Sequence, residues 1–314
     1  MKQSAAPCAF TSAESWVILN PIEQSIKQKI EKIGKPLKEW DVQIYRGVLT
    51  GCNEAFIIDE ATRNAILGNC KTADERKRTE QLIRPILRGR DIKRYAYEWA
   101  NLYLIATHNG YGRTPRIKIE NYPAVKKWLD KGGTAYNGKP FKGYEQIKDR
   151  ADQGDTPYNL RNCAYMDDFD KPKIVWAETM RIRKSNDERF PRFSFASASQ
   201  LTDKTCFFAT GDGDTLKCIL ALLNSFVGRY QLHNLVSKMD DGGWLMQKIY
   251  LEQVRIPSRQ EMHRVKAFVE KLLSTPNDES LEERIDTIFE ELFSLSKEEV
   301  QYIHSLMTKP LQRN

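Results

Sequence analysis

The sequence contains few of the residues that build disulfides or metal sites. Its 314 residues include 6 cysteines and 4 histidines. The cysteines lie far apart and form no Cys-x-x-Cys pair, so we expect a reduced, cytoplasmic chain without a disulfide framework. The histidines are equally scattered, and none stands at ligand spacing from a cysteine or an aspartate, so we expect no structural metal site.

Long apolar runs are also absent. No segment approaches the roughly 18 uncharged apolar residues that a membrane span requires. The first seven residues lack the apolar run of a signal peptide. We therefore expect no membrane partner. Internal repeats and low-complexity segments are missing too, which argues against solenoid and linker-like chains.

Common catalytic motifs are not found. The sequence has no P-loop, no Gly-x-Gly-x-x-Gly, no Gly-x-Ser-x-Gly and no Pro-Asp dipeptide of the kind found in metal-dependent nucleases. Asn20-Pro21-Ile22 lacks the second proline and the aromatic residue with which adenine methyltransferases hold a flipped base, and we interpret it as a helix interruption. Gly211–Asp214 precedes a helix, but its two aspartates would repel phosphate. We expect no catalytic residue in this chain.

The positive charge is unevenly distributed. The chain carries a net charge of +7, but residues 258–314 hold 8 Lys and Arg against 11 Asp and Glu. The preceding 257 residues hold 41 against 31. This asymmetry suits a body that faces a polyanion and a tail that faces protein. A surface that lysines merely keep soluble would explain the composition equally well.

Hydrophobic periodicity predicts an α+β fold, with a mixed β-sheet followed by a C-terminal helical segment. Residues 13–40 are expected to form a leading helix that stops at Gly34-Lys35-Pro36, and residues 42–46 and 55–58 to form a hairpin. Further strands are expected at 99–107, 173–178, 192–195, 205–209, 249–251 and 254–257. Further helices are expected at 71–84, 122–130, 215–235, 260–273, 280–294 and 297–307. We divide the chain into a mixed domain, 1–257, and a helical segment, 258–314.

Basic residues interleaved with glycines and aromatics form four clusters. Arginine and lysine neutralise phosphates, and arginine can also bridge the O6 and N7 atoms of guanine. Any one cluster is more often a solvated surface, but four clusters in loops between strands favour a nucleic-acid partner. The candidate DNA-binding residues are Arg88, Arg90, Lys93, Arg94, Arg113, Arg116, Lys118, Lys142, Arg181, Arg183 and Lys184.

Several segments together resemble the TaqI-like C-terminal specificity domain of type IIG restriction–modification enzymes and related adenine-specific DNA methyltransferases. Gly47–Phe56 is similar to that family's G-x-x-T-G-x-N-x-A-F, and Ile83–Ile92 to its I-x-P-x-L-R-G-R-D-I. Later landmarks are Lys171–Trp176, Leu222–Ser225 and Tyr250–Pro257. Residues 281–303 resemble the helical tail of these enzymes. Singly these matches are weak, but their order along the chain is specific.

The resemblance implies a target-recognition domain that holds double-stranded DNA together with an upstream methyltransferase domain of the same parent chain. That domain would bind S-adenosylmethionine and flip the adenine, and a nuclease domain, where present, would use Mg²⁺. No cofactor is therefore expected in this chain. We expect Thr50-Gly51 and Arg88–Arg94 at turns, and the loops 109–118, 139–160 and 179–190 at base edges. Two alternatives stay open: a protein-interaction module with a basic face, and a nuclease whose site is not recognisable.

Overall fold

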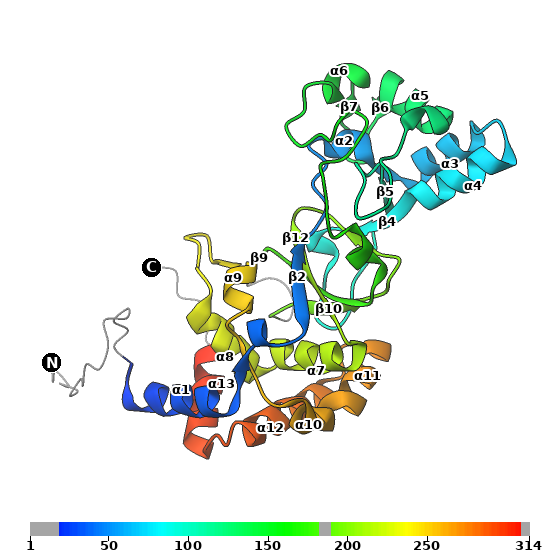
Figure 1. The fold of residues 1–314 in the computed structure, drawn as a ribbon. Coiled ribbons are helices and arrows are strands. Elements are labelled where there is room, and N and C mark those ends of the chain that lie inside the picture. Colours follow the sequence, from blue (N-terminus) through cyan, green and yellow to red (C-terminus); the bar gives the residue numbers. More distant parts are fainter. Residues whose placement is uncertain (1–18, 182–189, 309–314) are drawn as a thin grey trace.

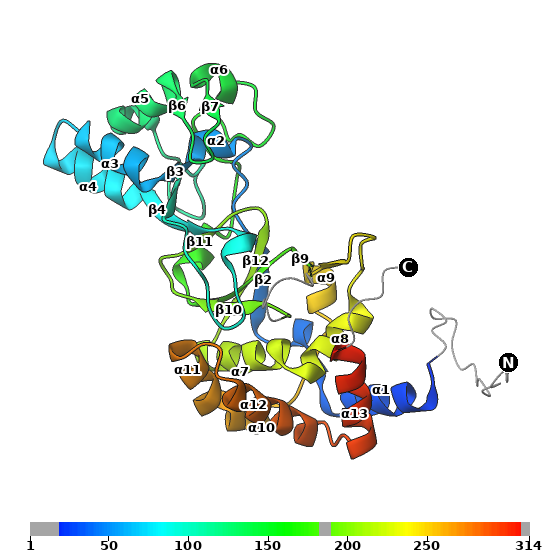
Figure 2. The ribbon, with the colours of Figure 1, turned by 180° about the vertical axis from the view of Figure 1, so that it is seen from behind.

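The computed structural model describes residues 19–181 and 190–308, and its fold is α+β, as predicted. Two hydrophobic cores divide these residues. We call residues 47–169 the inserted lobe and the remaining described residues the helical lobe. Figures 1 and 2 show the two lobes one above the other, with β2 and β12 between them. The chain leaves the helical lobe after residue 46 and returns to it after residue 169.

A four-stranded antiparallel sheet joins the lobes. Its order is β10 (Phe193–Ala196), β8 (Lys173–Ala177), β12 (Cys206–Gly211) and β2 (Val42–Arg46). Successive side chains of a strand point to opposite faces. Ile174 and Trp176 therefore enter the core of the helical lobe, whereas Val175 enters that of the inserted lobe. Burial on both faces explains why β8 is apolar along nearly its whole length.

The helical lobe packs against one face of this sheet. α7 (Gly213–Asn224) lies along it, and it is apolar on most sides because other helices cover it. Residues 215–235 form two helices where we predicted one, because Ser225 ends α7 and accepts a hydrogen bond from Gly228 N at the start of α8. The helices around α7 are α8 (Phe226–Leu235), α10 (Arg259–Met262), α11 (Lys266–Ser274), α12 (Glu279–Leu292) and α13 (Lys297–Thr308).

The first described helix, α1 (Pro21–Ile33), shows that our interpretation of Asn20-Pro21 was wrong. Asn20 caps the helix by accepting a hydrogen bond from Glu23 N, and the Glu23 carboxylate accepts one from Asn20 N. Proline at the first helical position completes a start signal, not an interruption. The helix ends at Gly34, as predicted, and β1 (Lys35–Pro36) then pairs with β14 (Arg255–Ile256). The part of the predicted helix before residue 19 lies outside the described residues.

A second sheet has the order β11 (Leu201–Thr202), β4 (Ile83–Leu87), β5 (Leu102–Ile105) and β3 (Ile57–Asp59). Its edge strand β11 comes from outside residues 47–169, and the other three strands belong to the inserted lobe. The inserted lobe also contains a short hairpin of β6 (Gly133–Thr134) and β7 (Pro140–Phe141). Its helices are α2 (Asn53–Phe56), α3 (Glu60–Gly68), α4 (Ala73–Leu82), α5 (Pro123–Lys131) and α6 (Tyr144–Ile147).

Two predicted strand assignments are wrong. β2 pairs with β12 and β3 pairs with β5, so residues 42–58 form no hairpin, and residues 53–56 form a helical turn. Gly51, at φ 64°, provides the predicted turn but directs the chain into a different sheet. Residues 248–251 form the short helix α9 (Lys248–Leu251), not a strand.

Helices α12 and α13 lie where they were predicted, but the predicted helix 260–273 is divided into α10, a 3-10 turn (His263–Val265) and α11. Val269, Phe289 and Ile303 belong to the same core as the sheet residue Trp176, so packing is continuous across residue 257. The division of the chain into a mixed domain, 1–257, and a helical segment, 258–314, therefore stays a prediction about which part faces DNA and which part faces protein. None of the described helices combines the length and the apolar character needed to cross a membrane.

Candidate nucleic-acid interface

Arg46, the last residue of β2, joins three segments at the point where the two lobes meet. Its Nη2 lies 2.7 Å from Glu178 Oε2, and its Nε donates to the Lys204 carbonyl at 3.2 Å. Its own carbonyl accepts a hydrogen bond from the Tyr165 hydroxyl at 3.0 Å. The Arg46 side chain is 43% exposed. Its guanidinium group therefore still faces solvent, although it is paired with the Glu178 carboxylate.

The segment that carries Arg90 lies against the same place. It forms a single 3-10 turn, η2 (Gly89–Asp91), and Gly89 N donates to Thr205 Oγ1 at 2.9 Å. A Cβ atom on Gly89 would lie 3.1 Å from the Cβ of Ala177, so any larger residue would require its neighbours to shift by a few tenths of an ångström. Arg90 and Lys204 are both exposed. We define Arg46, Arg90, Glu178, Lys204 and Thr205 as the junction patch, which holds three cations and one carboxylate.

Two predicted DNA-binding arginines have partners inside the protein. Arg88 Nη2 lies 2.7 Å from Asp91 Oδ1, and this hydrogen bond to a buried carboxylate raises the pKa of Arg88. Arg94 is only 10% exposed; its Nε lies 2.6 Å from Glu282 Oε2, and an Nη atom donates to the Asn224 carbonyl. Both guanidinium groups form charge-assisted hydrogen bonds inside the protein, which hold the fold, and a contact of Arg88 or Arg94 with DNA stays a prediction.

Three of the remaining candidates lie on the loop 109–118. Arg113 and Lys118 are exposed, and Arg116 Nη1 lies 3.2 Å from Asp155 Oδ2 on a neighbouring loop. Asn109 Nδ2 donates to the same carboxylate at 2.9 Å. The two loops therefore support each other.

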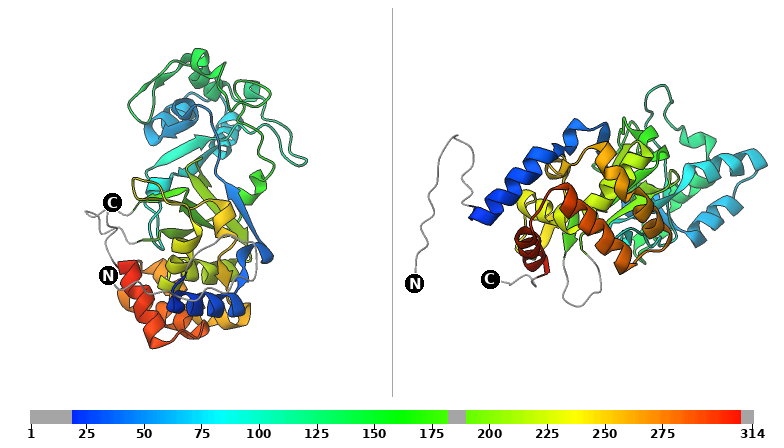
Figure 3. Two further views of the ribbon diagram at one scale, coloured as in Figure 1. Left: turned by 90° about the vertical axis from the view of Figure 1, so that its left-hand side faces the viewer. Right: turned by 90° about the horizontal axis from the view of Figure 1, so that it is seen from below.

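The other candidates are spread over both lobes. Lys142 is exposed beside β7, and Lys93 Nζ lies 3.7 Å from Glu98 Oε2. Arg181 ends β9 (Thr179–Arg181), which pairs with β13 (Gly243–Leu245), and its Nη2 lies 2.7 Å from Asp241 Oδ2. Arg183 and Lys184 lie outside the described residues. β9 follows Glu178 directly, so Arg181 lies three residues along the chain from the junction patch. The left view of Figure 3 shows the green and cyan segments of the inserted lobe above the blue and red helices of the helical lobe.

Sequence reasoning missed Arg46 and Lys204. Arg46 is the polar residue at the end of a buried strand, and that position was the available signal for it. Lys204 is a lone cation in a turn, and no sequence pattern distinguishes it. Arg161 reaches the same neighbourhood: Arg46 and Arg161 both lower the pKa of Tyr165, although burial dominates and raises it to about 12.

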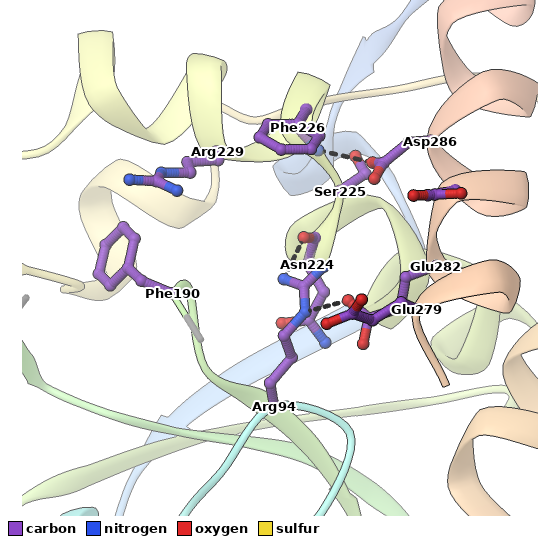
Figure 4. Close-up of a pocket in the computed structure, with 10 residues that line it drawn as sticks. Arg94, Phe190, Asn224, Ser225, Phe226, Arg229, Glu279, Glu282 and Asp286 are labelled. Atoms are coloured by element: carbon purple, nitrogen blue, oxygen red, sulfur yellow. Dashed lines mark hydrogen bonds and ion pairs between the residues drawn. The ribbon is translucent and has the colours of Figure 1, made fainter. Parts of the chain in front are cut away.

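A cavity of about 310 Å³ in the helical lobe is a different kind of site. Figure 4 shows Arg94 directed toward Glu282, whereas the Arg229 guanidinium lies on the side of Phe190, away from the carboxylates. Asp286 is 6% exposed and accepts a hydrogen bond from Phe226 N at 2.7 Å, and burial raises its pKa to about 7. Carboxylates outnumber arginines here, so this cavity does not suit a polyanion. Within residues 19–181 and 190–308, no group of three or more His, Cys, Asp and Glu is placed to hold a metal ion.

No protein-family model and no curated protein sequence matches the chain. Among solved structures, it is similar to the type IIL restriction–modification enzyme MmeI, whose structure was determined in complex with DNA. The TM-score is 0.55 at 10% identity, over 87% of this chain and 35% of MmeI. The type IIG restriction endonuclease BpuSI gives a TM-score of 0.48 at 13% identity, over 87% of this chain and 33% of that enzyme. The chain thus spans about a third of the length of each, and the likeness to MmeI concerns the fold.

Proposed function

We propose that this chain recognises a specific sequence of double-stranded DNA as the specificity domain of a type IIG-like restriction–modification enzyme or N6-adenine DNA methyltransferase. The observation that carries the proposal is the junction patch: exposed Arg46, Arg90 and Lys204, gathered where two lobes meet. A fold shared with part of MmeI, an enzyme solved with DNA, supports the same function. The order of the TaqI-like sequence segments favours this family.

Electrostatics gives the patch its role in the proposal. Cations that neutralise phosphates release condensed counterions, and this release provides most of the sequence-independent affinity for DNA. A duplex held at the patch would have one lobe on either side. The loops 109–118 and 139–160 would then approach base edges from the inserted lobe, and β9 with β13 from the helical lobe. Base edges carry the sequence information that phosphates lack.

The chemistry is assigned to a different domain of the parent enzyme. S-adenosylmethionine binding and adenine flipping would belong to a methyltransferase domain upstream, and any Mg²⁺-dependent cleavage to a nuclease domain. In this proposal the helical segment 258–314, with its excess of carboxylates, faces protein and not DNA.

A salt titration of duplex binding tests the proposal. We expect wild-type chain to bind duplex DNA with a log–log slope of roughly −0.9 per neutralised phosphate. Replacing Arg46, Arg90 and Lys204 by alanine should weaken binding and make the slope about 3 units less steep if each contacts a phosphate. The matched control removes three exposed cations of the tail, Arg264, Lys271 and Lys297.

The control variant should bind as the wild type does. No duplex binding at low salt, or a flat slope, would reject DNA as the partner and favour the protein-interaction alternative. Equal loss in the junction-patch and tail variants would mean that net charge alone governs binding, and the patch would lose its role.

A further inference from the structure

A second row of cations lies on the inserted lobe, along the edge where α4 meets α5. Contacts run in register between the two segments: Arg78 Nη2 donates to the Asn121 carbonyl at 3.3 Å, and Glu75 Oε1 accepts from Ala124 N at 3.1 Å. Further along, Lys127 Nζ donates to Asn69 Oδ1 at 2.9 Å, in the turn between α3 and α4. In Figure 1, α3 and α4 extend away from the strands β2 and β12.

Four basic side chains make up this edge. We define the α5 edge as Lys71, Arg78, Lys127 and Lys131, all of which are exposed. The acceptors that hold Arg78 and Lys127 are neutral oxygens, which fix the position of a cation without neutralising it. Among the described residues, no carboxylate forms an ion pair with any of the four, whereas Arg46, Arg88, Arg94, Arg116 and Arg181 all have one.

Two further features separate this edge from an ordinary solvated surface. Lys127 and Lys131 stand four residues apart on α5, so two like charges are neighbours on one face of the helix and repel each other. Glu75, on α4, is 4% exposed, and its two oxygens accept backbone hydrogen bonds from Lys71 and Ala124. A partner of opposite charge would relieve the repulsion between Lys127 and Lys131.

The surroundings of the edge point to the chemistry of that partner. The exposed large hydrophobic residues of the described chain are Tyr144, Met239 and Ile249, and none lies on α3, α4 or α5. Protein interfaces generally need apolar or aromatic anchors. Single-stranded nucleic acids are held largely by stacking on exposed aromatic rings. Contact with a duplex backbone needs only positioned cations.

We infer that the α5 edge binds the phosphate backbone of duplex DNA outside the sequence read at the junction patch. This inference rests on the proposed function, because it takes the duplex as the partner. The edge adds affinity without adding sequence information, and it acts only on DNA long enough to reach it.

Duplex length is the variable that tests the inference. The 314-residue chain is compared with a variant carrying Lys71→Ala, Lys127→Ala and Lys131→Ala, on duplexes of about 12 and about 40 base pairs. Arg78 is left in place because its carbonyl contact helps to hold α5. We expect the variant to bind the long duplex at least about tenfold more weakly, with a salt slope about 3 units less steep, and the short duplex unchanged.

The possible outcomes separate the two proposals. If the wild-type chain binds both duplexes and the variant binds them equally well, the α5 edge has no role in DNA binding. The proposed function would still stand. Equal weakening on both lengths places the edge within the recognition site and overturns its flanking role. Failure of the wild-type chain to bind either duplex rejects the proposed function. Polyglutamate is then added as a competitor to the complexes with the long duplex. If it displaces the duplex from the wild-type chain but not from the variant, an acidic protein is the better partner for the edge.

Discussion

The buried pair between Arg94 and Glu282 gives the sharpest prediction about the architecture. Arg94 belongs to a loop that leaves the inserted lobe and reaches α12, so this pair ties the two lobes together. Glu282→Ala would leave the Arg94 guanidinium without its carboxylate, near the already cationic Arg229. Removing one member of a buried ion pair typically costs about 3–5 kcal/mol of folding free energy.

The structure places the expected value at the lower end of that range. The two side chains are 10% and 11% exposed, so solvent screens the pair little. Arg94 would keep its hydrogen bond to the Asn224 carbonyl, and Asp286, whose pKa Arg94 lowers, would compensate part of the charge by ionising more readily. We therefore expect Glu282→Ala to lower the free energy of unfolding by about 3 kcal/mol in urea denaturation.

A double variant is the control. Arg94→Met with Glu282→Leu removes both charges, so it should be markedly more stable than Glu282→Ala. It should also bind duplex DNA as the wild type does, because Arg94 has a structural role in this account. A loss of less than about 1 kcal/mol in Glu282→Ala would refute the reasoning about the buried pair. A folded double variant that no longer binds DNA would support the prediction that Arg94 contacts the duplex.

Two further predictions concern stability. Burial raises the pKa of Asp286 to about 7, so the folded chain retains a proton that the unfolded chain loses; this group's contribution to stability should be full below pH about 4 and be lost as pH rises to about 7. Asp286→Asn should abolish that pH dependence in denaturation curves, and an unchanged profile would contradict it. Gly143 has φ 66°, and a Cβ there would lie 2.2 Å from the Asp130 carbonyl oxygen, so Gly143→Ala should cost at least about 2 kcal/mol. Gly68→Ala, in a helix with open space around it, should be neutral or stabilising, and equal effects at both positions would refute this.

Strong local patterns made much of the fold predictable. β8 and β12 are short, almost wholly apolar runs, and α12 repeats buried residues at helical spacing, so each appeared close to its predicted position. α3 was missed because its nine residues contain only two buried ones, Ile66 and Leu67, and so carry little periodicity. The false hairpin at 42–58 has a different cause: β2 was recognisable and residues 57–58 do lie in a strand, but each strand's partner lies far along the chain.

The site was predictable only in part, because an arginine's partner decides what it can bind. The pair of Arg88 with Asp91 spans three residues, and the sequence contained enough to suggest it. The pair of Arg94 with Glu282 spans 188 residues, and no local pattern indicates it. The junction patch likewise depends on Gly89 meeting Thr205, a contact between segments 116 residues apart.

Selection from a library of randomised duplexes tests the central claim most directly. If the junction patch holds DNA while the neighbouring loops contact base edges, the wild-type chain should enrich a common sequence motif. The variant lacking Arg46, Arg90 and Lys204 should retain little DNA at the same salt concentration. Retention of DNA by the wild type with no common motif would contradict sequence recognition, and enrichment of the same motif by the variant at equal yield would contradict the role of the patch.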